Sequence, residues 1–265
     1  MSRRLRLDAE LVRRGLVSSR DQAADLIAAG RVAVAGQRAA KPTSQVATDA
    51  AITVAPGDQE PAYVSRAGYK LAGALAAFAG LTVAGKRCLD AGASTGGFTD
   101  ALLRAGAGQV VAVDVGYGQL AWSLRSDDRV SVLDRVNVRT LTPEQVAPAP
   151  ELVVADLSFI SLRPVLPALV GCAAPAADFV LMVKPQFETG RELVHGGVVR
   201  DPALRSQAVA DIAAAAADLG LGAAGITASP LPGPSGNVEY FLWLRRGAPA
   251  LDAGLLAHAI AAGPQ

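Results

Sequence analysis

The sequence has little cysteine and little histidine, with two of each among its 265 residues. The cysteines, Cys88 and Cys172, lie far apart in apolar stretches, so they do not form the framework of a disulfide-rich secreted domain. Two histidines and two scattered cysteines also provide no metal-ligand spacing, and no metal site is expected. Such sparse cysteines are typical of proteins of the reducing cytoplasm.

Long apolar runs are absent as well. A membrane-spanning helix needs about 18 to 20 predominantly apolar residues, and the most apolar stretch, 212–226, is interrupted by Asp218 and by glycines. The charged start of the chain is not followed by the apolar core of a secretion signal. These absences predict a cytoplasmic protein with no membrane-spanning segment, and they leave its oligomeric state open.

Charge is distributed unevenly along the chain. The net charge is +1, but residues 1–41 carry eight arginines and one lysine against four acidic residues, a surplus of +5 that leaves −4 for the remainder. A basic segment of this kind attracts a polyanion such as RNA. A basic surface that only keeps the protein in solution is the alternative, and charge alone does not decide between them.

The first 60 residues predict a small α+β domain. Two short helices are expected, each with an apolar face and each followed by a glycine, Gly15 and Gly30, that can adopt a left-handed conformation. Their expected N-terminal caps are Asp8 and Ser19. A hairpin over 32–41 and a closing strand over 51–54 complete the domain.

A polar joint rich in turn-forming residues separates this segment from a larger α/β domain. We place the first domain at 1–60, the joint at 61–64 and the second domain at 65–265. After residue 86, strand and helix patterns alternate, which predicts a mostly parallel sheet of seven strands with helices on both faces. The expected strands are 87–90, 109–114, 130–133, 152–156, 179–184, 223–228 and 239–244. The expected helices after Ser65 include 98–105, 162–172 and 202–219.

Four successive predicted strands each end in an aspartate, namely Asp90, Asp114, Asp134 and Asp156. In open α/β sheets, ligands bind at the carboxyl ends of the strands. The turn after the first strand lacks the Gly-x-Gly-x-x-Gly spacing of dinucleotide enzymes. An Asp-x-Gly turn suits a nucleoside-type methyl donor, which has no pyrophosphate, although the spacing to the second aspartate would also suit NAD. The candidate donor-binding residues are Asp90, Gly92, Ala93, Ser94, Gly96, Gly97, Asp114 and Asp134.

The order of apolar, basic and glycine residues from Arg6 to Gly36 resembles the S-four RNA-binding domain. The resemblance implies that basic side chains of this domain hold RNA phosphates, which fix affinity and orientation rather than sequence. The candidate RNA-binding residues are Arg3, Arg6, Arg14, Arg20 and Lys41, with Arg66 at the start of the second domain. Taken singly, each could instead be a solubilising residue.

The second domain resembles the TlyA (hemolysin A) family, which is close to the ribose-methylating FtsJ group. The matching segments are 64–71 (VSRAGYKL), 90–99 (DAGASTGGFT), 114–120 (DVGYGQL), 155–161 (ADLSFIS), 183–188 (VKPQFE) and 235–241 (SGNVEYF). Two departures occur near the joint: Tyr63 stands where the family usually has tryptophan, and Arg66-Ala67-Gly68 replaces Arg-Gly-Ala. The resemblance implies a Rossmann-like methyltransferase that uses S-adenosylmethionine.

In the ribose-methylating relatives the catalytic residues form a Lys-Asp-Lys-Glu tetrad, which falls here on Lys70, Asp156, Lys184 and Glu239. A ribose 2′-hydroxyl must lose its proton as it attacks the sulfonium methyl group. A lysine accepts a proton only as a neutral amine, which burial and a neighbouring cation favour. We therefore expect Lys184 to be the general base, with Lys70 as a second cation and the two carboxylates as orienting groups.

The implied activity is methylation of ribose 2′-hydroxyls, of cytidines, in the 16S and 23S RNA of ribosomal subunits. The Asn-Pro-Pro-aromatic motif of base-amino methyltransferases is absent, and Asp156-Leu157-Ser158-Phe159 replaces it. Two other functions stay open. A membrane-active hemolysin has little support, because no amphipathic basic helix with aromatic residues is present. A noncatalytic RNA-binding ribosome-assembly factor would bind RNA but transfer no methyl group.

Overall fold

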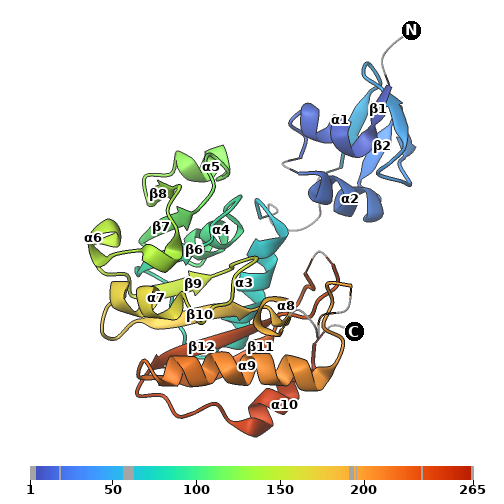
Figure 1. The fold of residues 1–265 in the computed structure, drawn as a ribbon. Coiled ribbons are helices and arrows are strands. Elements are labelled where there is room, and N and C mark those ends of the chain that lie inside the picture. Colours follow the sequence, from blue (N-terminus) through green and yellow to red (C-terminus); the bar gives the residue numbers. More distant parts are fainter. Residues whose placement is uncertain are drawn as a thin grey trace. The chain divides into compact units, whose positions relative to one another are not determined.

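The computed structural model describes residues 4–17, 19–55, 63–190, 194, 196–233 and 235–263. The chain divides into two compact units, Met1–Arg66 and Ala67–Gln265, which Figure 1 draws in blue and in cyan to red. The sequence placed the first boundary near residue 60, and the division falls a few residues later, where a long helix begins.

The first unit pairs two helices with five short strands. In chain order the elements are β1 (Arg4–Arg6), α1 (Leu7–Arg13), α2 (Arg20–Ala28), β2 (Val32–Val34), β3 (Gln37–Arg38), β4 (Gln45–Ala47) and β5 (Ile52–Val54). Strand β2 lies between β3 and β5 in one antiparallel sheet, and β1 pairs with β4 in another. The core is a single apolar cluster of Leu7, Leu11, Val17, Ala23, Ile27, Val32 and Val46.

Most predicted ends of the two helices are confirmed. Gly15 and Gly30 have φ of 68° and 69°, and Ser19 accepts a hydrogen bond from the backbone N–H of Gln22 at 3.1 Å. The prediction that Asp8 caps the first helix is wrong, because α1 already begins at Leu7. The first backbone N–H groups of α1 donate to carbonyl groups of residues 42 and 44, so the helix needs no side-chain cap.

The second unit is a three-layer α/β domain. Its strands are β6 (Arg87–Ala91), β7 (Gln109–Asp114), β8 (Val130–Asp134), β9 (Leu152–Ala155), β10 (Asp178–Val183), β11 (Leu221–Ala228) and β12 (Tyr240–Arg246). Its helices are α3 (Arg66–Ala77), α4 (Gly97–Arg104), α5 (Trp122–Arg125), α6 (Pro143–Val146), α7 (Leu166–Cys172), α8 (Pro185–Glu188), α9 (Pro202–Ala217) and α10 (Ala253–Ala261), with a 3-10 turn, η1, at Val138–Thr140.

The seven strands form one sheet in the order β11-β12-β10-β9-β6-β7-β8. Strand β12 runs antiparallel to both of its neighbours, and all other pairs are parallel. The predicted seven-stranded, mostly parallel sheet is therefore confirmed. Helix α9 packs against β10, β11 and β12, whereas α4 packs against β6 and β7 (Figure 1).

Burial on both faces explains why the central strands are almost wholly apolar. All four residues of β9 are buried, as are five of the six residues of β10. Alternate residues of β6 point to opposite faces. Leu89 and Ala91 belong to the main core, while Asp90 points to the face that α4 covers.

Helix α7 begins four residues later than predicted from the sequence. Pro164 disfavours the α-helical conformation at the preceding residue, Arg163, and the segment from Leu162 to Val165 forms turns instead. In the described part of the chain, no helix has the length and apolar character needed to cross a membrane.

Candidate active site

The carboxyl ends of the central parallel strands lie in register at one edge of the sheet. Ala91 of β6 is opposite Val113 of β7 and Ala155 of β9, and Asp114 of β7 is opposite Asp134 of β8. The four aspartates predicted at strand ends therefore share this edge. The chain order reverses between β6 and β9, which is the position where open α/β sheets bind ligands.

Asp90 is fully buried at this edge. Its Oδ2 accepts a hydrogen bond from the Thr99 hydroxyl at 2.6 Å, and its Oδ1 has no hydrogen-bond partner in the described structure. Burial raises the pKa of Asp90 to about 7, even though the Thr99 hydroxyl lowers it. A buried carboxylate oxygen without a partner is well suited to accept a hydrogen bond from a ligand or its ordered water.

The glycine-rich turn after β6 leaves no room for larger side chains. Gly92 has φ of +88°, and a Cβ atom there would lie 2.6 Å from the backbone carbonyl oxygen of Asp156. Gly96, with φ of +99°, immediately precedes α4. Both positions need glycine because other residues rarely adopt these conformations. The turn can thus bring its backbone close to a ligand.

Asp114 joins this turn to the segment that follows β7. Its Oδ2 accepts a hydrogen bond from the backbone N–H of Ser94 at 2.8 Å, and its Oδ1 accepts one from Gly116 at 2.7 Å. The remaining predicted donor-binding residues of the turn, Ala93 and Gly97, are buried. The carboxylate therefore lies against the turn, where a ribose hydroxyl of a nucleoside ligand could reach it.

Asp134 forms an ion pair that the sequence did not predict. Arg125 of α5 donates to Asp134 Oδ2 at 2.7 Å, and this contact holds the pKa of Asp134 below its usual value. Helix α5 is in turn fixed to the glycine-rich turn, because the backbone N–H of Ala121 donates to the carbonyl of Thr95 at 3.2 Å. The end of β8 and the glycine-rich turn are thus connected through α5.

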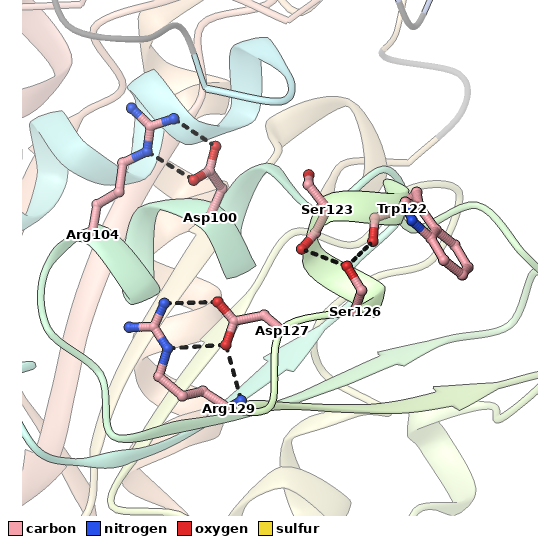
Figure 2. A network of polar contacts seen from close by, with 7 residues as sticks. All are labelled: Asp100, Arg104, Trp122, Ser123, Ser126, Asp127 and Arg129. Atoms are coloured by element: carbon pink, nitrogen blue, oxygen red, sulfur yellow. Dashed lines mark hydrogen bonds and ion pairs between the residues drawn. The ribbon is translucent and has the colours of Figure 1, made fainter.

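Helix α5 also carries an exposed aromatic side chain. Figure 2 shows Trp122 with the hydroxyl of Ser126 donating to its carbonyl oxygen at 2.9 Å. The next turn is held by an ion pair between Asp127 and Arg129 at 2.7 Å. The side chain of Trp122 is 78% exposed, although the backbone of its helix is firmly bonded.

A buried ion pair between a lysine and a glutamate lies at the same edge of the sheet, next to the start of β12. Lys70 of α3 donates to Glu239 Oε2 at 2.6 Å, and both side chains are buried. The other oxygen, Glu239 Oε1, accepts from the Gln186 amide at 3.5 Å. A Cβ atom at Gly233 would lie 2.7 Å from this oxygen, so Gly233 packs closely against the carboxylate.

A second lysine forms its own pair. Lys184 Nζ lies 2.5 Å from Asp156 Oδ1 and donates to the Ser158 hydroxyl at 3.0 Å. Lys184 directly follows β10, and Asp156 directly follows the parallel neighbour β9. Because Val183 pairs with Tyr240, Lys184 and Glu239 are adjacent across β10 and β12. The structure thus brings the four predicted tetrad residues to one sheet edge as two ion pairs.

The sequence did not single out three further side chains at this edge. Ser158 and Gln186 contact the two ion pairs, as described above. Phe159 is 92% exposed, has φ of 65°, and its ring centroid lies 5.4 Å from that of Phe187. All three lie in segments that resemble the TlyA family, but a motif match does not reveal exposure or hydrogen bonding.

The predicted RNA-binding side chains of the first unit are mostly exposed. Arg6, Arg20 and Lys41 reach solvent, and Arg66, which begins α3, is partly buried. Arg3 lies outside the described residues. Exposed cations of this kind can meet phosphate groups, but Arg6 already donates two hydrogen bonds to the carboxylate of Asp8, at 3.1 and 2.6 Å.

Arg14 is held within the first unit. Its guanidinium donates to Glu10 at 2.7 Å and to the backbone carbonyl groups of Thr48 and Ala50 at 3.0 and 2.8 Å. The two bonds to the carbonyl groups fasten the end of α1 to the segment before β5. The structure therefore gives Arg14 an internal role, beside the RNA contact predicted from the sequence.

In the described residues, no group of three or more histidine, cysteine, aspartate or glutamate side chains is placed to hold a metal ion.

Two family models match the chain. They are the FtsJ-like methyltransferase, over residues 63–246, and the S4 domain, over residues 5–59. Together they cover both units.

The individual proteins to which the chain is similar indicate the same families. The chain is 63% identical to the 16S/23S rRNA (cytidine-2′-O)-methyltransferase TlyA of Mycobacterium tuberculosis, over 92% of this chain and 91% of that protein. It is 38% identical to Hemolysin A of Brachyspira hyodysenteriae, over 89% and 98% of the two chains. A solved structure of a candidate hemolysin from Streptococcus thermophilus superposes with a TM-score of 0.78 at 36% identity, covering 98% and 96%. The chain therefore belongs to the FtsJ-like methyltransferase family, in the TlyA branch that carries an S4 domain ahead of the methyltransferase domain.

Proposed function

We propose that this protein methylates the ribose 2′-hydroxyl of cytidines in 16S and 23S ribosomal RNA, acting on ribosomal subunits in the cytoplasm. The observation that carries the proposal is the buried Lys70–Glu239 contact and the partly buried Lys184–Asp156 contact, beside a glycine-rich turn. The relative from Mycobacterium tuberculosis, whose name states this activity, is 63% identical to the chain over 246 aligned residues.

The methyl donor is S-adenosylmethionine, and the residues at the sheet edge fit it. Gly92 and Gly96 let the backbone approach a nucleoside, and Asp114 lies where it can accept from ribose hydroxyls. Asp134 would accept from the adenine amino group. Asp90 presents an oxygen without a partner to the positive charges of the donor or to an ordered water. When bound, the donor supplies a sulfonium methyl group that is already activated for in-line attack.

Lys184 is the residue that accepts the proton of the 2′-hydroxyl at Nζ. Accepting the proton requires a lone pair on Nζ. Asp156 and Ser158, which contact Nζ at 2.5 and 3.0 Å, fix its position. The Lys70–Glu239 pair, with Gln186, orients the acceptor ribose. Phe159 offers an exposed ring on which the base of that nucleotide can stack.

The binding of S-adenosylmethionine will depend on pH through Asp90. Because its pKa is raised to about 7, the carboxyl is largely neutral below pH 7 and ionised above it. The cationic donor prefers the ionised form, so we expect its Kd to rise as pH falls from 7 to 5, by up to about tenfold per pH unit. Calorimetric titration over this range measures the effect. Asp90→Asn should bind weakly at every pH, and Asp127→Asn, at an exposed ion pair, should keep the wild-type profile. An unchanged slope in Asp90→Asn would rule out this carboxylate.

Reversing the charge of Arg6 and Arg20 will weaken RNA binding and flatten its salt dependence. Each phosphate contact contributes about 0.7 to 0.9 to the slope of log K against log salt, so two lost contacts should lower the slope by about 1.5. Filter binding of ribosomal RNA at several salt concentrations measures it. Arg246→Glu is the matched control, because Arg246 is exposed at the end of β12, on the sheet edge opposite the tetrad. Equal slopes for both variants would show that the first unit does not hold phosphates.

The proposal as a whole is tested by transfer of labelled methyl groups from S-adenosylmethionine to purified ribosomal subunits. Label that maps to ribose 2′-oxygens of cytidine supports it, and the labelled subunit identifies the substrate. Donor binding without transfer to either subunit would contradict it and favour a noncatalytic RNA-binding role. Lack of donor binding would exclude the methyltransferase reaction altogether.

A further inference from the structure

Glu188 ends helix α8, four residues after Lys184, and its carboxylate reaches a different segment of the chain. Glu188 Oε2 accepts from the Ser161 hydroxyl at 2.5 Å, and Oε1 accepts from the backbone N–H of Leu162 at 2.9 Å. The Ser161 hydroxyl also accepts from the backbone N–H of Arg163 at 3.2 Å. Burial raises the pKa of Glu188, and its oxygens are committed to these two donors.

These bonds join the two segments that carry the second ion pair. Lys184 and Glu188 belong to the segment after β10, whereas Asp156 and Ser161 belong to the segment after β9. At one end the segments meet through Lys184 and Asp156, and at the other end they meet through Glu188. The residues between these contacts are held on both sides.

Ser158 and Phe159 are the residues held in this way. Ser158 lies 3.0 Å from Lys184 Nζ, and Phe159 has a left-handed backbone with φ of 65°. That conformation is unfavourable for a residue with a Cβ atom, and a ring that is 92% exposed gains little from burial. The ring touches Phe187, a contact too small to fix the backbone alone. A further restraint is needed, and the bonds of Glu188 provide it.

We propose that Glu188 is a positioning residue for methyl transfer: it fixes the turn of Ser158 and Phe159 against Lys184 so that the acceptor nucleotide meets both. This inference rests on the proposed function. Glu188 touches neither donor nor RNA and acts through the turn. Its loss should therefore lower kcat and leave the Kd of S-adenosylmethionine and the KM for ribosomal subunits within about twofold.

Three variants measure this effect. Glu188→Ala removes both bonds and should lower kcat by about tenfold. Glu188→Gln should keep kcat within about threefold of wild type, because its amide can accept from Leu162 and bond to the Ser161 hydroxyl. Ser161→Ala removes one of the two bonds of Glu188, together with the bond that the hydroxyl accepts from Arg163, and should lower kcat by about threefold. It keeps the test available if Glu188→Ala does not fold. Wild-type kcat in both alanine variants would overturn the proposal.

A double-mutant cycle separates positioning from loss of folding. If Glu188 acts through the turn, Glu188→Ala should lower kcat by less than about twofold when Ser158 and Phe159 are already alanine. A full tenfold loss in that background would overturn the proposal. Asp252→Ala, which removes the cap of α10 at Leu255, is the control for lost stability and should keep wild-type kcat. If wild type transfers no methyl group to ribose, the proposed function has failed; if wild type is active and the cycle is additive, only this inference has failed.

Discussion

Replacing Lys184 with alanine is expected to lower the rate of methyl transfer by about 10²- to 10⁴-fold and to leave RNA binding within about twofold. Lys184 Nζ contacts Asp156 and Ser158 just after β10, and Lys184 is not among the residues proposed to hold RNA phosphates. Its removal therefore affects the proton transfer rather than the association. Single-turnover transfer to ribosomal subunits measures the rate, and filter binding measures the affinity.

Two further variants show why the rate falls. Lys184→Arg keeps the positive charge but cannot lose a proton near neutral pH, so it should be as slow as the alanine variant if Lys184 is the general base. Substantial activity in Lys184→Arg would show that the charge alone is needed. Lys86→Ala is the matched control, because Lys86 pairs with Asp178 at 2.8 Å on the opposite edge of the sheet. It should transfer methyl groups at the wild-type rate.

Replacing Lys70 with alanine is expected to destabilise the protein by about 3–5 kcal/mol and to stop methyl transfer. The substitution leaves Glu239, which is 1% exposed, without the ammonium group that lies 2.6 Å from it. An unpaired buried charge is far costlier than a buried pair, because the desolvation of the remaining group is no longer offset. Urea unfolding followed by circular dichroism measures the change in the free energy of unfolding.

A double substitution separates the stability of the Lys70–Glu239 pair from its function. Lys70→Met with Glu239→Gln replaces both charges by neutral groups of similar size and should recover most of the lost stability. It should not recover methyl transfer. The control is Arg163→Ala, since Arg163 and Asp211 form an exposed pair that should contribute less than about 1 kcal/mol. Equal losses in the free energy of unfolding for Lys70→Ala and Arg163→Ala would show that the buried pair stabilises the protein no more than an exposed pair does.

The sequence predicts the second unit better than the first. The predicted strands 109–114 and 179–184 are apolar on both faces, and they match β7 and β10 (Asp178–Val183) to within one residue. In the first unit, the start of α1 depends on carbonyl groups of residues 42 and 44, which lie far along the chain. The pairing of the short strands β1 and β4 likewise depends on bringing together two segments that are distant in the sequence. Local patterns do not contain such contacts.

The candidate site, too, could be predicted only in part from the sequence. The resemblance to the TlyA family identified Lys70, Lys184 and their carboxylates, and the structure then shows how they pair. The ion pair of Arg125 with Asp134 could not be predicted, because a four-residue helix has almost no periodic signal. The outward orientation of Phe159 was equally hidden, since an aromatic residue next to an apolar one such as Ile160 normally indicates a core position.

The two tryptophans lie in opposite surroundings. Trp243 is 6% exposed in β12 and donates its indole N–H to Asp178 at 2.9 Å, whereas Trp122 is 78% exposed on the helix that bonds to the donor turn. Intrinsic fluorescence therefore contains two separable signals, a blue-shifted emission from the sheet and a red-shifted emission from the helix that bonds to the glycine-rich turn. Iodide quenches the second and spares the first. The protein thus carries one optical probe of its folding and another of the edge where we propose that the methyl donor binds, without any attached dye.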